Sequence, residues 1–89
     1  MSYPKGDLRR AWVILGAIDA LEYASTRRIA ENLGLPISSV HNQIQKLCSG
    51  EIPGLVITHK DGSYVIESWG EVLNASGVRQ FYTRHCASR

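Results

Sequence analysis

Apolar residues recur at helical spacing along the first part of the chain. Residues 7–23 form the first such segment and predict a helix with a broad apolar arc along one side. The arc consists of Ile14, Ala17, Ile18 and Leu21. A second apolar stripe on the same helix consists of Leu8, Trp12 and Leu15. A helix that is apolar on two sides must be covered on two sides. One side can meet the rest of the domain, and the other can meet either the C-terminal segment or a second copy of the chain.

Two shorter helical patterns follow and are separated by a tight turn. Residues 26–33 predict a helix that is capped by Ser25 or Thr26. Gly34 follows this helix and can end it, because glycine readily adopts the positive φ of a helix C-terminus. Pro36 begins the next predicted helix, residues 36–48. The inward residues of the two helices are Ile29, Ala30 and Leu33, and then Ile37, Val40, Ile44 and Leu47. Cys48, at the end, is expected to be a small buried side chain.

A hairpin and a final helical pattern complete the chain. Residues 55–67 contain two β-rich runs around Asp61-Gly62, a strong signal for a type I′ turn because both central residues need a positive φ. Residues 69–85 predict a helical tail, which Gly77 can divide into two pieces. The apolar residues of this tail are Trp69, Val72, Leu73, Val78, Phe81 and Tyr82.

The order of the elements predicts an α+β fold that is mainly helical. Helix, helix, tight turn, helix and hairpin in succession make a three-helix winged helix-turn-helix, with a two-stranded β-hairpin as its wing and a C-terminal helix after it. A chain of 89 residues is enough for one small domain, so we expect residues 1–89 to form a single domain.

Composition favours a globular protein of the cytoplasm. Hydrophobic residues make up 44% of the chain and charged residues 20%, which argues against disorder. The longest apolar stretch is far short of the roughly 20 residues that a membrane span needs, and no secretory signal is visible. The 2 cysteines lack the spacing of a metal site or a disulfide scaffold. We therefore expect free thiols, no membrane association and no cofactor.

Catalysis is not indicated by any motif in the sequence. The common hydrolase, P-loop and zinc-protease motifs do not occur. His41, His59 and His85 have no carboxylate or thiol at a convincing metal-binding or catalytic spacing. The formal net charge of +2 permits a polyanionic partner without requiring one, so the distribution of charge matters more than its sum.

The third predicted helix has an outer face that suits the major groove of DNA. This face has no Asp or Glu, whereas a solvated helix usually mixes charges of both signs. Amides can bond adenine bidentately, and hydroxyls can donate or accept. The candidate base-contacting residues are Ser38, Ser39, His41, Asn42 and Gln45. Of these, His41 lies on a flank, where it can equally pack against the second helix or the wing.

A second group of residues is expected to contact the DNA backbone. Arg27 and Arg28 lie in the first turn of a helix, where the macrodipole disfavours cations, and phosphate contact explains their presence. The full set of candidates is Arg27, Arg28, Gln43, Lys46, His59 and Lys60. If about four to six cations meet phosphates, affinity should fall with salt at a log–log slope of roughly −4 to −5.

The helix-turn-helix segment resembles the DNA-binding domains of IclR-type bacterial regulators and, more loosely, those of the MarR type. The resemblance rests on Ile29-Ala30, Leu33-Gly34-Leu35-Pro36, Ser38-Ser39-Val40-His41, Leu47 and the wing end Asp61 to Ile66. It implies a cytoplasmic, sequence-specific DNA-binding regulator that is usually dimeric. Asn42 stands where that family commonly has Arg, and Ile37 stands where it has a basic residue. The target sequence therefore cannot be carried over. We expect no effector domain of the kind that this family carries, and so no small-molecule effector.

The leading hypothesis is a small dimeric repressor that acts by occupying its operator on double-stranded DNA. The candidate dimer interface combines Leu8, Trp12 and Leu15 with Trp69, Val72, Leu73, Val78, Phe81 and Tyr82, although these aromatics can also be the core of one chain. Two alternatives stay open. One is a winged-helix module that binds protein rather than DNA. The other is a plasmid or phage DNA-binding factor that serves replication or recombination.

Overall fold

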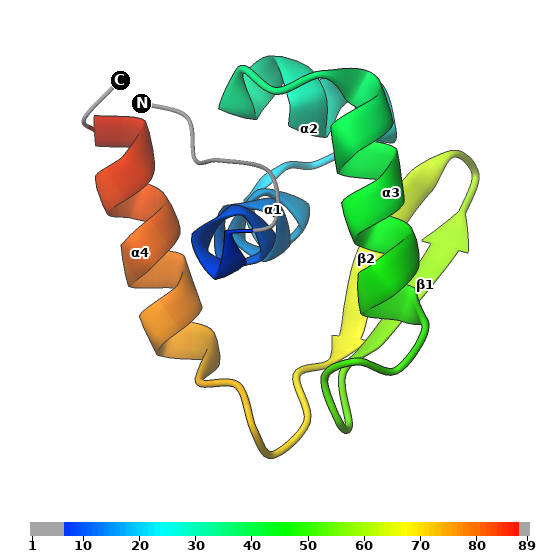
Figure 1. Cartoon of the computed structure of the whole chain (residues 1–89), viewed down its shortest axis with the longest axis vertical. Coiled ribbons are helices and arrows are strands. Elements are labelled where there is room, and N and C mark those ends of the chain that lie inside the picture. The colour runs from blue at the N-terminus through cyan, green and yellow to red at the C-terminus, as the bar shows by residue number, and fades with distance from the viewer. Residues whose placement is uncertain (1–6, 88–89) are drawn as a thin grey trace.

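The computed structural model describes residues 7–87, which form four helices and one two-stranded antiparallel sheet (Figure 1). In chain order the elements are α1 (Leu8–Ala20), α2 (Thr26–Leu33), α3 (Ile37–Cys48), β1 (Val56–Lys60), β2 (Ser63–Ser68) and α4 (Ala75–Ala87). The prediction of a mainly helical α+β fold is confirmed. Helix α1 lies in the middle, and α3 and α4 pack on opposite sides of it.

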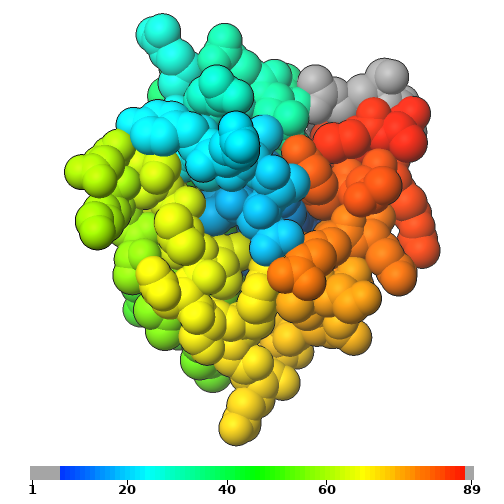
Figure 2. Space-filling model, turned by 180° about the vertical axis from the view of Figure 1, so that it is seen from behind, coloured from blue at the N-terminus to red at the C-terminus, as the bar shows by residue number. Residues whose placement is uncertain are grey.

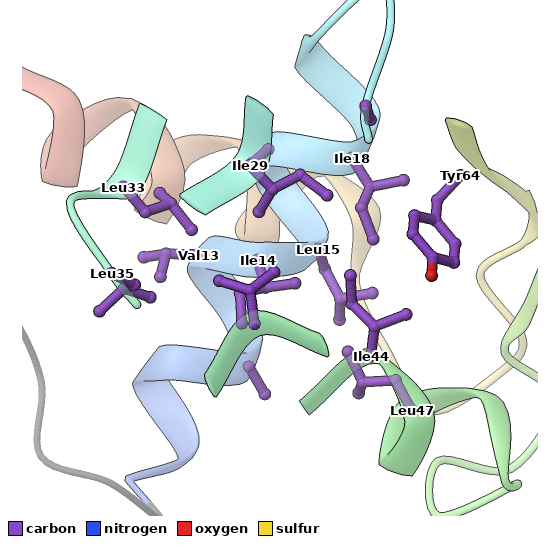
Figure 3. Close-up of a cluster of buried hydrophobic side chains, with 14 of the residues drawn as sticks. Val13, Ile14, Leu15, Ile18, Ile29, Leu33, Leu35, Ile44, Leu47 and Tyr64 are labelled. Carbon is purple, nitrogen blue, oxygen red and sulfur yellow. The ribbon is translucent and has the colours of Figure 1, made fainter. Parts of the chain in front are cut away.

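The hydrophobic core is built around α1. Figure 3 shows its buried side chains together with those that approach from α2, α3 and β2. The central members are Val13, Ile14 and Leu15 of α1, Ile29 of α2, Ile44 and Leu47 of α3, and Tyr64 of β2. Burying one such aliphatic side chain stabilises the fold by about 1.5–3 kcal/mol. This cluster therefore fixes the position of α3 relative to α1.

The turn between α2 and α3 has the predicted chemistry. Gly34 adopts φ 68° and ψ 35°, the left-handed conformation that glycine reaches without steric cost. Ser25 caps α2, because its Oγ accepts a hydrogen bond from the Arg28 N–H at 3.2 Å. Pro36 lies one residue before α3 rather than inside it, since its ψ of 141° is extended. Helix α3 thus begins at Ile37 and not at residue 36.

The hairpin is also formed as predicted, within one residue of its expected ends. Asp61 and Gly62 both have positive φ, at 53° and 81°, as a type I′ turn requires. The strands pair in register from Lys60 opposite Ser63 to Ile57 opposite Ile66, and a bulge follows at Val56. The Tyr64 N–H donates to the Ala24 carbonyl at 2.9 Å, which joins the hairpin to the segment between α1 and α2.

Helix α1 is shorter than the prediction of residues 7–23. Asp7 caps its start, and the carboxylate accepts a hydrogen bond from the Arg9 N–H at 2.9 Å. At the other end, Leu21 turns into extended backbone with ψ 137°. The chain leaves the helix there and reaches the hairpin, where the Tyr23 hydroxyl donates to the Asp61 carbonyl at 2.6 Å. A helix that continued to Tyr23 would lack this extended connection.

The predicted tail helix is wrong over its first six residues, Trp69 to Asn74, and α4 begins at Ala75. Gly70 has φ 73°, which interrupts any helix, and the Asn74 side chain accepts a hydrogen bond from the Gly77 N–H at 3.0 Å. Asn74 therefore acts as a cap, and Gly77 lies inside the helix instead of dividing it. The helical spacing of Trp69, Val72 and Leu73 is coincidental.

Helix α4 covers the second apolar side of α1 from within the same chain. The Trp12 and Phe81 rings meet edge to face with centroids 5.7 Å apart, and Tyr82 packs directly on Gly16. Arg79 binds Asp19 through two hydrogen bonds of 2.8 and 3.2 Å. The carboxylate of Asp19 raises the pKa of the Arg79 guanidinium. Leu15, a member of the second apolar stripe, is fully buried within the chain in this arrangement.

Candidate nucleic-acid interface

Helix α3 presents the polar face that the sequence predicts. Val40, Ile44 and Leu47 are buried against the core, and this stripe determines which side of the helix remains outside. Four of the candidate base-contacting residues are exposed, namely Ser38, His41, Asn42 and Gln45. Ser39 is half-buried. The outer face is therefore a surface of amides, a hydroxyl and an imidazole.

The charge of this face is neutral to positive along the whole helix. Helix α3 contains no acidic residue, and its one cation, Lys46, is exposed in the last turn. A cation at that end of a helix is favoured by the macrodipole. Gln43, a candidate for backbone contact, is half-buried at the edge of the face. A polyanion that approached α3 would meet no repelling carboxylate on the helix itself.

Arg27 and Arg28 lie in the first turn of α2 and are both exposed. Neither forms an ion pair with the residues that the structure describes, 7–87. The first turn of α2 contains no acidic residue that would offset the unfavourable position of two cations at a helix N-terminus. These guanidinium groups are thus available to an external anion.

The hairpin contributes a third group of candidate contacts near its tip. His59 and Lys60 are exposed, and the His59 ring stacks on Tyr64 with centroids 4.3 Å apart and planes at 13°. Stacking restricts the imidazole to one orientation beside the last residue pair of the hairpin. Asp61, at the turn itself, is the acidic exception in this part of the surface.

Two functional candidates are not apparent from the sequence. Ile37 is predicted on the buried face of its helix, yet 49% of it is exposed, because the first residue of α3 lies beyond the part that contacts the core. Tyr23 fixes the hairpin tip through its hydrogen bond to Asp61, although 38 positions separate the two residues in sequence. Figure 2 shows the hairpin tip directly beside the segment that joins α1 and α2. No local pattern signals such a contact.

The prediction for Cys48 is wrong. The sequence predicts a buried side chain, but Cys48 is exposed at the C-terminus of α3. The apolar stripe of that helix ends at Leu47, and Cys48 projects to a different side.

Other kinds of site find little support in residues 7–87. No group of three or more His, Cys, Asp or Glu side chains in this range is arranged to hold a metal ion. None of the described helices combines the length and apolar character that crossing a bilayer requires. In comparisons with known proteins, no family model, no curated protein and no solved structure matched the chain.

Proposed function

We propose that this chain is a cytoplasmic, sequence-specific double-stranded DNA-binding protein that acts as a small dimeric transcriptional repressor. One observation carries the proposal. Helix α3 is held by a fully buried apolar stripe, while its opposite face is exposed, rich in amides and free of acidic groups. A rigid helix with such a face has the dimensions and hydrogen-bonding groups to enter the major groove.

The exposed residues divide into two roles under this proposal. Ser38, Asn42 and Gln45 contact base edges, and His41 contacts the edge of the same groove. The cations Arg27, Arg28, Lys46 and Lys60 contact phosphates on either side. Four phosphate contacts predict a log–log salt slope of about −4.

A second copy of the chain is the proposed partner on the α1–α4 side. A groove of about 280 Å³ lies there, lined mainly by Trp12, Val72, Leu73, Val78 and Phe81. Leu8, one helical turn from Trp12, is 70% exposed, and Val72 is 66% exposed. Each copy thus offers both an apolar hollow and projecting apolar side chains, which is what a twofold interface between identical surfaces requires. A dimer that binds two half-sites also reaches an affinity that a single short recognition helix on one half-site does not.

The dimer is tested by sedimentation over a range of protein concentrations. Val72→Glu should shift the equilibrium toward monomer, because the change puts a charge into the apolar contact. Val56→Glu is the matched control, since Val56 is 46% exposed at the opposite end of the hairpin from its tip. Equal behaviour of the two variants, or a monomeric wild type at all concentrations, rejects this interface.

DNA recognition is tested by selection from a random duplex pool at ~150 mM salt, a concentration at which specific complexes persist. Gln45→Ala and Asn42→Ala should each reduce the preference for one base at particular positions of the selected sequence. Gln80→Ala, an exposed glutamine on α4, is the control and should leave the preference intact.

The backbone contacts are tested with the same selected duplex. The double variant Arg27→Ala/Arg28→Ala should lower the affinity for all DNA sequences about equally and reduce the steepness of the log–log salt slope by about 2. Arg84→Ala, a change at an exposed residue of α4, should leave the affinity and the salt slope unchanged.

The main alternative is a module that binds protein through the α3 face. It predicts that selection returns no preferred sequence and that Asn42→Ala leaves residual DNA binding unchanged. A plasmid or phage factor for replication or recombination has the same surface and the same selection result, so the genomic location of the selected sequence distinguishes it from a repressor.

A further inference from the structure

Ile37 is an exposed apolar residue at the start of the helix that carries the proposed reading surface. It is the first residue of α3, and 49% of it is exposed. No other large hydrophobic side chain of α3 is exposed; Val40, Ile44 and Leu47 are all buried. A side chain of this kind on a surface of amides and hydroxyls is not explained by packing within the described residues.

The position of Ile37 on the helix is the one that meets base edges. When a recognition helix docks in the major groove, its N-terminal residues approach the bases most closely. Ile37, His41 and Gln45 follow one another at intervals of four residues, so they lie along one side of α3. Ile37 therefore belongs to the same surface as the polar candidates.

The chemistry of the groove supplies one apolar partner for such a side chain. Of the groups that base pairs present in the major groove, only the C5-methyl of thymine is apolar. The neighbouring amides prefer adenine. Of the two residue types that read guanine, α3 has no arginine and one lysine, Lys46, which the proposed function places on a phosphate. Ile37, Asn42 and Gln45 thus favour A·T pairs.

Helix geometry sets the spacing of these contacts. Asn42 and Gln45 are three residues apart, a rise of about 4.5 Å, and successive base pairs are about 3.4 Å apart. If α3 lies along the groove, the two amides meet neighbouring base pairs. Ile37 precedes Asn42 by five residues, about 7.5 Å, which corresponds to roughly two base pairs.

We infer that Ile37 determines specificity by contacting the methyl group of a thymine, in a half-site of A·T pairs whose adenines bind Asn42 and Gln45. This inference rests on the proposed function, because it requires α3 to enter the major groove. It adds to that function the composition of the half-site and a residue that reads it without a hydrogen bond.

The test replaces single thymines by deoxyuridine in the selected duplex. This change removes the methyl group and keeps base pairing. For the wild type, one position per half-site should show about a fourfold loss of affinity, the effect of losing one buried methyl group. Ile37→Ala should bind the thymine and deoxyuridine duplexes with equal affinity. Ile37→Val should keep most of the wild-type difference in affinity between the two duplexes. Val56→Ala, a change at another half-exposed apolar residue, should keep the whole of that difference.

The possible results separate the inference from the proposed function. If selection yields a preferred duplex but no thymine is sensitive, or if Ile37→Ala retains the sensitivity, the inference is wrong and the proposed function stands. Selected half-sites made of G·C pairs would likewise overturn the inference alone. If selection yields no preferred sequence at all, the proposed function fails and the inference fails with it. Circular dichroism of Ile37→Ala, which should match the wild type because the residue is half-exposed, shows that the variant is folded.

Discussion

Helices α3 and α4 pack on opposite sides of α1, have nearly the same length, and are held in different ways (Figure 1). Helix α3 is attached by a regular apolar stripe, and its outer face is polar. Helix α4 buries only Val78 and His85 and is attached mainly by aromatic and ionic contacts, such as Trp12–Phe81 and Asp19–Arg79. Beside it an apolar groove stays open. One side of the molecule thus exposes a polar helix face, and the other exposes an apolar groove.

The largest expected effect is the loss of the α3 anchor. Ile44→Ala should lower the free energy of unfolding by about 2–5 kcal/mol, because Ile44 is fully buried and the change leaves a cavity. Val78→Ala on α4 removes two methyl groups and should cost less, about 1–2 kcal/mol. Urea unfolding of both variants measures the difference. An equal or larger loss for Val78→Ala would mean that the two helices are attached alike.

Glycines in α1 and α4 give opposite predictions for the same substitution. A Cβ at Gly16 would collide with the Cβ of Tyr82 and lie 2.6 Å from its Cγ, so Gly16→Ala should be destabilising by a net of about 1 kcal/mol despite the better helix propensity of alanine. A Cβ at Gly77 would contact only the Asn74 side chain, at 3.6 Å or more. Gly77→Ala should therefore be stabilising by about 0.5–1 kcal/mol.

The sign of the Gly16→Ala effect tests whether α4 packs on α1 as described. If α4 were detached, alanine would stabilise α1 as it does any exposed helix interior. Thermal unfolding that shifted upward for Gly16→Ala, as for Gly77→Ala, would therefore contradict this packing.

A smaller effect is expected where the hairpin is joined to the rest of the fold. Tyr23→Phe removes the hydrogen bond to the Asp61 carbonyl and should cost about 0.5–1.5 kcal/mol. The change should also weaken DNA binding slightly, because His59 and Lys60 lose their fixed position. Hydrogen exchange at the hairpin amides reports the loosening directly. Unchanged exchange in Tyr23→Phe would show that this hydrogen bond does not hold the tip.

The smallest effect concerns the start of α1 and depends on pH. Hydrogen bonds from Arg9 to the Asp7 carboxylate lower the pKa of Asp7 to about 2, from an ordinary value of 3.8. Because the folded pKa is the lower one, the contribution of Asp7 is fully present above pH 3.8 and is lost as the pH falls toward 2. Asp7→Asn should thus be less stable than the wild type at pH 7, and the gap should close in acid. A gap as large at pH 2 as at pH 7 would contradict the stated cause.

The segment of α2 and α3 and the C-terminal tail differ in how well the sequence predicts their structure. Four strong local signals determine α2 and α3: the cap Ser25, the turn glycine Gly34, Pro36 and the buried period of Val40, Ile44 and Leu47. These signals predict the boundaries of both helices to within one residue. In the tail, by contrast, apolar spacing at Trp69 to Leu73 competes with the turn at Gly70 and the Asn74 cap, and the turn chemistry decides the outcome.

For the candidate site, the sequence predicts the face but not its edges. Exposure of Ser38, Asn42 and Gln45 follows from helical periodicity. Periodicity cannot predict that Ile37 and Cys48 are exposed, because a helix end can extend past the core that buries its middle. The contact of Tyr23 with Asp61 depends on tertiary structure and has no counterpart in the local sequence.

The central claim is that the outer face of α3 enters a DNA duplex, and a titration followed by NMR tests it most directly. Adding the selected duplex to ¹⁵N-labelled protein should shift the backbone signals of residues 38–46, those at the hairpin tip and those of Arg27 and Arg28. Signals of residues 79–84 in α4 should stay in place, unless dimerisation has already moved them before DNA is added. Shifts confined to α4, or none in α3 at saturating duplex, would contradict the account.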